Sequence, residues 1–117
     1  MVLDKFVDLE IGGRKHKLCY PIRYVFEAER QLSDGNFMIL TVKAADGIPP
    51  TVHDMFVIIK YAFMGGDPSL TEEEAEELYL DAVDEKTIIE VFQLAMSALK
   101  KSGVLGQEKK APAAPKA

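Results

Sequence analysis

Two adjacent glycines near the start of the chain, Gly12 and Gly13, constrain its fold more than any other feature of the 117 residues. The favoured two-residue hairpin turn needs a positive φ at both central positions, and glycine adopts that conformation without a steric penalty. If these glycines form the turn, Ile11 faces Arg14, and all the other facing pairs follow from that register. The segment 6–20 is therefore predicted to be an antiparallel β-hairpin.

This register sorts the side chains of the hairpin into two chemically distinct faces. The facing pairs are mostly apolar on one face and oppositely charged on the other: Val7–Leu18 and Leu9–His16, then Asp8–Lys17 and Glu10–Lys15. Cross-strand pairs of this kind contribute roughly 0.2–1 kcal/mol each. Because an isolated two-stranded ribbon is marginally stable in water, we expect the apolar face to pack on helices.

The segment 21–47 predicts two helices. Pro21 suits a first helical turn, and Ile22, Val25, Phe26 and Leu32 form the apolar positions of the first helix. Periodicity leaves residues 37–45 ambiguous between a short buried helix and a strand. We favour a helix because Asn36 suits its amino-terminal cap and Gly47 its end.

Three further amphipathic segments complete the predicted fold. Thr51 suits the cap of a helix over 52–63, and Gly65-Gly66-Asp67-Pro68 is predicted to break the chain after it. The capping-box spacing of Thr71 and Glu74 predicts a helix over 71–82, and Asp84 is expected to cap a last helix. The fold class is therefore α+β, with an N-terminal antiparallel β-hairpin packed on a bundle of about four helices.

Charge and composition divide the chain into a domain over residues 1–106 and a disordered Lys/Ala/Pro tail over 107–117. The formal charge of -5 becomes -7 when that basic tail is removed. An acidic body argues against nucleic acid as a partner, and the absence of a long apolar run argues against a membrane span. With one cysteine, Cys19, and no secretion signal, we expect a cytoplasmic protein.

No catalytic, cofactor or metal-binding motif is found, so the chain is predicted not to be an enzyme. His16 and His53 are far apart in the sequence, and no His or Cys pair has metal-ligand spacing. Asp67-Pro68-Ser69-Leu70 is similar to the Asp-Ser-Leu of carrier proteins, but Pro68 interrupts the motif. The run Glu72–Glu77 is interpreted as a solvated helix face, or alternatively as a docking face for a basic segment.

The apolar helices predict either plain burial or contact with a partner. For so short a chain, the helices over 52–63 and 88–99 carry more apolar surface than the hairpin and each other would cover. The candidate contact residues are Met55, Phe56, Ile59, Phe63, Phe92 and Met96. In the alternative, a small acidic protein–protein adaptor, the docking face consists of Glu73, Glu76 and Glu77.

The order of elements resembles a family of small proteins. A hairpin with a Gly-containing turn leads into Phe26-Glu27-Ala28-Glu29-Arg30-Gln31-Leu32, then an apolar helix, a Thr-Glu-Glu-Glu helix start and a last amphipathic helix. Over roughly residues 3–105 this pattern is similar to the tail assembly chaperones of long-tailed bacteriophages and prophages.

The resemblance implies a non-enzymatic assembly factor that is absent from the finished virion. Its implied partner is the helix-rich tape measure protein, which the chaperone keeps soluble while tail tube subunits polymerise around it. The tail tube protein is a second candidate partner. Self-association is a separate expectation, which follows from the excess apolar surface of the helices over 52–63 and 88–99.

Overall fold

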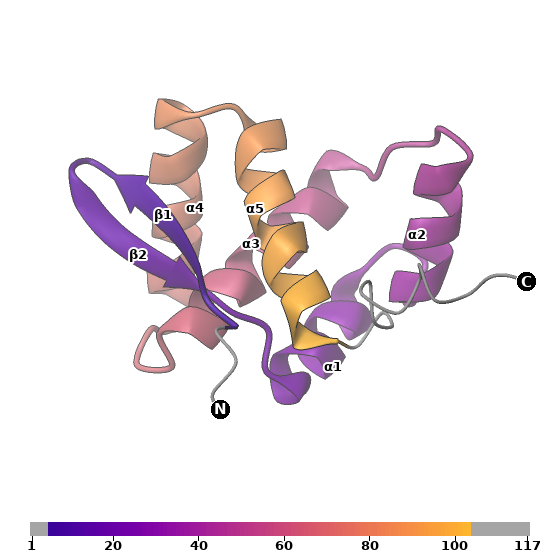
Figure 1. Ribbon diagram of the computed structural model, residues 1–117, viewed down its shortest axis with the longest axis horizontal. Coiled ribbons are helices and arrows are strands. Elements are labelled where there is room, and N and C mark those ends of the chain that lie inside the picture. The colour runs from indigo at the N-terminus through magenta and orange to yellow at the C-terminus, as the bar shows by residue number, and fades with distance from the viewer. Residues whose placement is uncertain (1–4, 104–117) are drawn as a thin grey trace, which may run out of the picture.

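The computed structural model describes residues 5–103, so the predicted tail over 107–117 and the predicted domain end at residue 106 lie outside the described residues. Two strands precede five helices, as the ribbon shows (Figure 1). The elements are β1 (Val7–Ile11), β2 (Arg14–Leu18), α1 (Ile22–Gln31), α2 (Phe37–Ala45), α3 (Val52–Gly66), α4 (Glu72–Glu85) and α5 (Ile88–Ser102). The α+β prediction is confirmed.

The hairpin has the predicted register from Val7↔Leu18 to Ile11↔Arg14. Gly12 and Gly13 have φ values of +58° and +79°, as the turn requires. The predicted apolar face is buried, with Leu9 and Leu18 at most 2% exposed. A contact not predicted from the sequence holds the tip, where the Gly12 N–H donates to Glu85 Oε1 at 2.7 Å.

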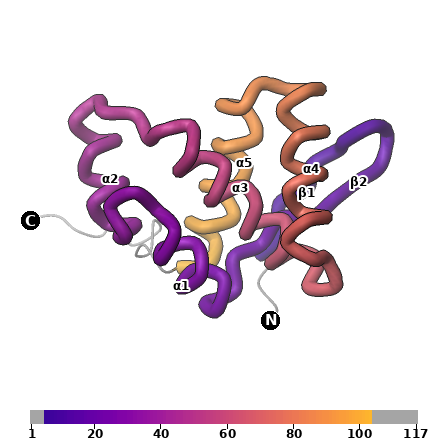
Figure 2. The backbone as a smooth tube through the Cα atoms, turned by 180° about the vertical axis from the view of Figure 1, so that it is seen from behind, coloured from indigo at the N-terminus to yellow at the C-terminus, as the bar shows by residue number. Residues whose placement is uncertain are grey.

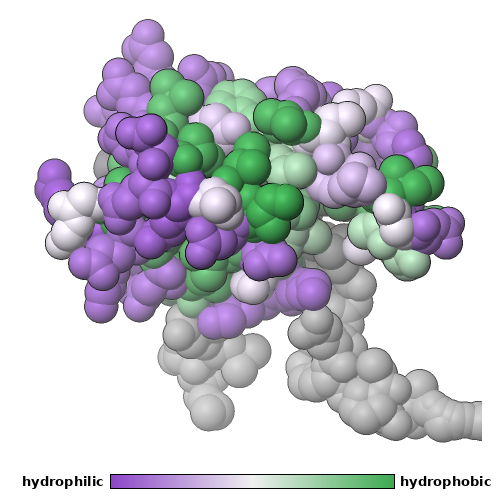
Figure 3. All heavy atoms as spheres, turned by 90° about the horizontal axis from the view of Figure 1, so that it is seen from above, coloured by the Kyte–Doolittle hydropathy of each residue, from purple (hydrophilic) through white to green (hydrophobic). Residues whose placement is uncertain are grey.

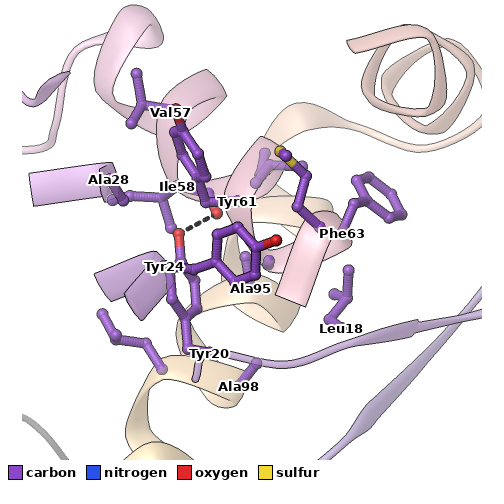
Figure 4. Close-up of a cluster of buried hydrophobic side chains, with 14 of the residues drawn as sticks. Leu18, Tyr20, Tyr24, Ala28, Val57, Ile58, Tyr61, Phe63, Ala95 and Ala98 are labelled. Carbon is purple, nitrogen blue, oxygen red and sulfur yellow. Dashed lines mark hydrogen bonds between the residues drawn. The ribbon is translucent and has the colours of Figure 1, made fainter. Parts of the chain in front are cut away.

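Helix α3 is the centre of the fold. It contacts α1, α4, α5 and β2, and α3 and α5 lie between α2 on one side and α4 with the hairpin on the other (Figures 1 and 2). Val57, Ile58 and Ile59 are fully buried. Tyr20 joins the strand end to this helix, because its hydroxyl donates to the Ile58 carbonyl at 2.5 Å inside the apolar cluster (Figure 4).

The predicted break at Gly65-Gly66-Asp67-Pro68 is present but begins two residues later than predicted, because α3 continues through both glycines and ends at Gly66. Their role is close packing against the hairpin backbone. A Cβ on Gly65 would lie 2.0 Å from the Cys19 carbonyl oxygen, and one on Gly66 would lie 1.8 Å from that of Lys17. Both distances are far inside van der Waals contact, so only glycine permits this approach of β2 to α3.

The caps of the helices confirm part of the prediction and correct one boundary. Segment 37–45 is a helix, and Asn36 accepts hydrogen bonds from the Met38 and Ile39 N–H groups. The capping box of Thr71 and Glu74 is present. Asp84 does not cap α5 but lies within α4, which runs on to Glu85. A second capping box, formed by Thr87 and Glu90, begins α5 instead.

Buried tyrosines make alkaline pH a test of this packing. Burial raises the pKa of Tyr20 well above its usual value, and it also raises the pKa of Tyr79. Burial, followed by the Glu72 carboxylate, raises the pKa of Tyr61 to about 12. The Tyr61 hydroxyl donates to Glu72 Oε2 at 3.2 Å and accepts from Gln31 Nε2 at 2.7 Å.

We therefore expect the buried tyrosines to contribute fully to the free energy of unfolding below about pH 10, the ordinary tyrosine pKa. Above that pH the free energy of unfolding should fall. The folded state then holds protons that the unfolded state releases, which costs up to about 1.4 kcal/mol per pH unit for each such tyrosine. Urea unfolding between pH 8 and about pH 11.5 measures how the free energy of unfolding changes with pH. This fall should continue until the pH reaches the raised pKa values of the folded protein. Tyr61→Phe should flatten the slope, and an unchanged slope in this variant would contradict the assignment.

Candidate interaction surfaces

The structure places the predicted contact residues of α3 in the core. Met55, Ile59 and Phe63 are 7%, 0% and 1% exposed. Phe56 packs edge-on against Tyr79, with ring centroids 4.8 Å apart. Phe92 and Met96 are partly buried against the core. Of the two predicted alternatives, plain burial holds for Met55, Ile59 and Phe63, because α3 contacts four other elements and its wide apolar stripe packs against them.

Exposed apolar side chains gather instead on α2 and the segment that follows it. We call Met38, Ile39, Val42, Ile48 and Val52 the α2 surface; their exposed fractions lie between 41% and 64%. This surface was not predicted from the sequence, because a short, highly apolar segment normally predicts burial. In the space-filling view, hydrophilic residues dominate the hairpin side, whereas hydrophobic residues are exposed in the middle and toward α2 (Figure 3).

Helix α2 is held at its amino end. Its buried side chains, Phe37 and Leu40, point into the protein. Glu29 Oε2 accepts from the Phe37 N–H at 2.9 Å. Asp54, which is 5% exposed on α3, accepts from both the N–H and the hydroxyl of Ser33 in the preceding loop. These contacts fix α2 while leaving its outer face to solvent.

A second exposed pair lies on α1. Ile22 and Phe26, here called the α1 surface, are 57% and 58% exposed. The sequence placed them on the same apolar face as Val25, yet the helix turns Tyr24, Val25 and Ala28 inward. Ala28 is fully buried, and α1 contacts α3. Ile22 also borders a shallow groove of about 380 Å³ whose lining includes Tyr20, Pro21 and Val25.

The net negative charge of the described residues is confined to α4. This helix holds eight acidic residues and no basic one. The other described residues carry eleven basic and nine acidic side chains, a balance of +2. The sequence analysis located the acidic run but did not show that the remainder of the domain is nearly neutral.

The acidic docking residues predicted from the sequence have unequal surroundings. Glu73 and Glu77 are exposed. Glu76 Oε2 instead lies 3.7 Å from the Nζ of Lys60, a buried lysine that also lies 4.0 Å from Glu72 Oε1. Part of the predicted docking face therefore compensates an internal cation, and Glu73 and Glu77 remain for an external partner.

The side chains considered for chemistry have structural contacts. The His53 ring lies 3.1 Å from the Gln31 carbonyl oxygen, and the His16 ring packs edge-on against Phe63. Ser69 lies in the turn before α4, and its hydroxyl donates to Asp67 Oδ1 at 2.6 Å. Within residues 5–103 no group of three or more His, Cys, Asp or Glu side chains could hold a metal ion.

No family model, curated protein or solved structure matches the chain. Among the described residues, none of the helices has both the length and the apolar character needed to span a membrane.

Proposed function

We propose that this protein is a tail assembly chaperone of a long-tailed bacteriophage or prophage, which acts without catalysis by binding the tape measure protein. The observation that carries the proposal is the α1 surface. Ile22 and Phe26 expose more than half of their side chains on a regular helix that is anchored in the core by Val25 and Ala28. Large apolar side chains held rigidly at a surface are typical of protein-binding sites.

The spacing of this pair suits a helical client. Ile22 and Phe26 are four residues apart and so lie one turn apart on one face of α1. The neighbouring groove gives a client side chain apolar contact with Tyr20, Pro21 and Val25. An amphipathic helix of the tape measure protein would cover this surface with its own apolar face.

Charge on α4 supports the second requirement of a chaperone, which is to keep a complex dispersed. Its eight acidic residues give each bound copy a negative face, and like charges on neighbouring complexes repel. In this proposal the protein acts in the host cytoplasm, assists the tail tube protein to polymerise and is absent from the virion.

Co-expression with a candidate tape measure protein tests the proposal. The wild-type chain should keep the tape measure protein in the soluble fraction, and Phe26→Asp should reduce that fraction at least about tenfold, because it places a charge in an apolar contact. Ile89→Asp is the matched control, since Ile89 is 53% exposed in the first turn of α5, where an acidic residue is tolerated. Equal precipitation with and without the wild-type chain would refute the chaperone function.

An acidic adaptor is the second candidate function, and the confinement of net charge to α4 favours it. The double variant Glu73→Lys/Glu77→Lys tests it while leaving the Lys60–Glu76 pair intact. Under the adaptor hypothesis this charge reversal abolishes partner binding, whereas a chaperone that acts through Ile22 and Phe26 retains its client. A pull-down experiment with the same partner compares Phe26→Asp with the double variant. Loss of binding in Phe26→Asp alone supports the chaperone, and loss in the double variant alone supports the adaptor.

A further inference from the structure

The α2 surface carries an inference that does not depend on the proposed function. We infer that two copies of this chain pair through their α2 helices, which lie antiparallel across a two-fold axis. The contact is formed by Met38, Val42 and Ala45 at its centre, with Ile39, Ile48 and Val52 around them.

The first argument is that the polar groups of α2 already have partners within the chain. Lys43 Nζ lies 2.9 Å from Asp34 Oδ2. The Thr41 hydroxyl donates to the Phe37 carbonyl at 2.8 Å, and Asn36 caps the first turn. The outer face therefore offers aliphatic carbon with no charge at its centre, and an apolar, uncharged surface is its best partner.

The second argument is the order of side-chain sizes along α2. Met38, Val42 and Ala45 are exposed and follow the i, i+4, i+7 spacing of one helix face. A two-fold axis makes an interface isologous, so that residue i of one copy contacts residue j of the other, and the reverse. An antiparallel pair centred near Val42 sets the large Met38 of each copy against the small Ala45 of the other, so the face is complementary to itself.

The third argument is electrostatic. The eight acidic residues of α4 lie across the molecule from α2, with α3 and α5 between them (Figures 1 and 2). In a pair joined through α2, the two α4 helices lie at opposite outer ends. Salt screens charges that are more than about 8 Å apart, so the repulsion between the two acidic helices is weak.

The area available indicates a weak dimer. Six exposed aliphatic side chains form a contact at the small end of specific interfaces. We therefore expect a dissociation constant in the micromolar range, about 1–100 μM.

Sedimentation over a concentration series tests the pairing. Between about 5 and 500 μM, a range that spans the expected dissociation constant, the average mass should rise from 13.0 kDa toward twice that value. Val42→Asp should remain a monomer throughout, because it places two like charges at the two-fold axis. Ile89→Asp should dimerise as the wild type does, since Ile89 lies outside the α2 surface.

Cross-linking tests the orientation. Met38→Cys mixed with Ala45→Cys should give a disulfide-linked dimer upon oxidation, whereas each variant alone should give far less, and the parent chain with its buried Cys19 should give none. A wild-type chain that stays monomeric at every concentration would overturn the inference. So would a Val42→Asp chain that still dimerises but no longer binds the tape measure protein, since α2 would then be a client site. Loss of client binding in Phe26→Asp alone bears on the proposed function and leaves the dimer intact.

Discussion

Replacing Gly66 with alanine is expected to lower the free energy of unfolding by about 3 kcal/mol or more, the upper range for a side chain forced into a packed site. The added Cβ would lie 1.8 Å from the Lys17 carbonyl oxygen, which belongs to the backbone of β2 and has no rotamer through which to move away. In a helix without such a neighbour, the same change would stabilise by about 1 kcal/mol. The sign of the effect therefore reports whether β2 lies against α3.

Urea unfolding followed by circular dichroism measures this effect. Gly47→Ala is the matched control, because an added Cβ there meets nothing within 4 Å and the cost comes from a φ of +85° alone. That cost is about 1–2 kcal/mol. A Gly66→Ala chain as stable as the wild type would show that the hairpin does not pack on this helix as described.

Phe63→Ala is expected to destabilise the protein by about 3–5 kcal/mol, the range for removing a buried aromatic side chain. Phe63 is 1% exposed, lies near Leu18 in the central cluster (Figure 4) and contacts the edge of the His16 ring. Its removal leaves a cavity between the hairpin and α3 that the surrounding backbone cannot fill.

The same unfolding measurement separates core from contact surface. Phe26→Ala should change stability by no more than about 0.5 kcal/mol, because Phe26 is 58% exposed. If Phe63→Ala does not fold, Ile59→Val provides a milder test with an expected loss of about 0.5–1.5 kcal/mol. Unchanged stability in Phe63→Ala, together with loss of a bound partner, would restore the original expectation that Phe63 contacts a client.

The features predicted correctly from the sequence are those decided by neighbouring residues. Gly12 and Gly13 determine the turn, and the turn determines the register of the hairpin. The caps formed by Asn36 and Thr71 were likewise visible, because a capping side chain acts on backbone groups two or three residues away. The Thr87–Glu90 box has the same spacing and could have been recognised in place of the Asp84 cap.

The candidate surfaces could not be predicted in this way. An apolar stripe shows which residues favour burial, but it does not show whether the same chain or a partner protein buries them. Met55, Ile59 and Phe63 look the same in the sequence as exposed contacts would, and four neighbouring elements bury them. Ile22 and Phe26 share a predicted helix face with Val25, yet of these three only Val25 is buried.

The β-hairpin and its register, several helix caps and the location of the acidic run could be predicted without the structure. Each of these depends on interactions between residues close together in the chain. Tertiary structure alone decided that Gly65 and Gly66 are packing positions, that Lys60 is buried beside Glu76, and that α2 presents its aliphatic face to solvent. These features depend on contacts between segments that are distant in the sequence, above all on which elements pack against α3.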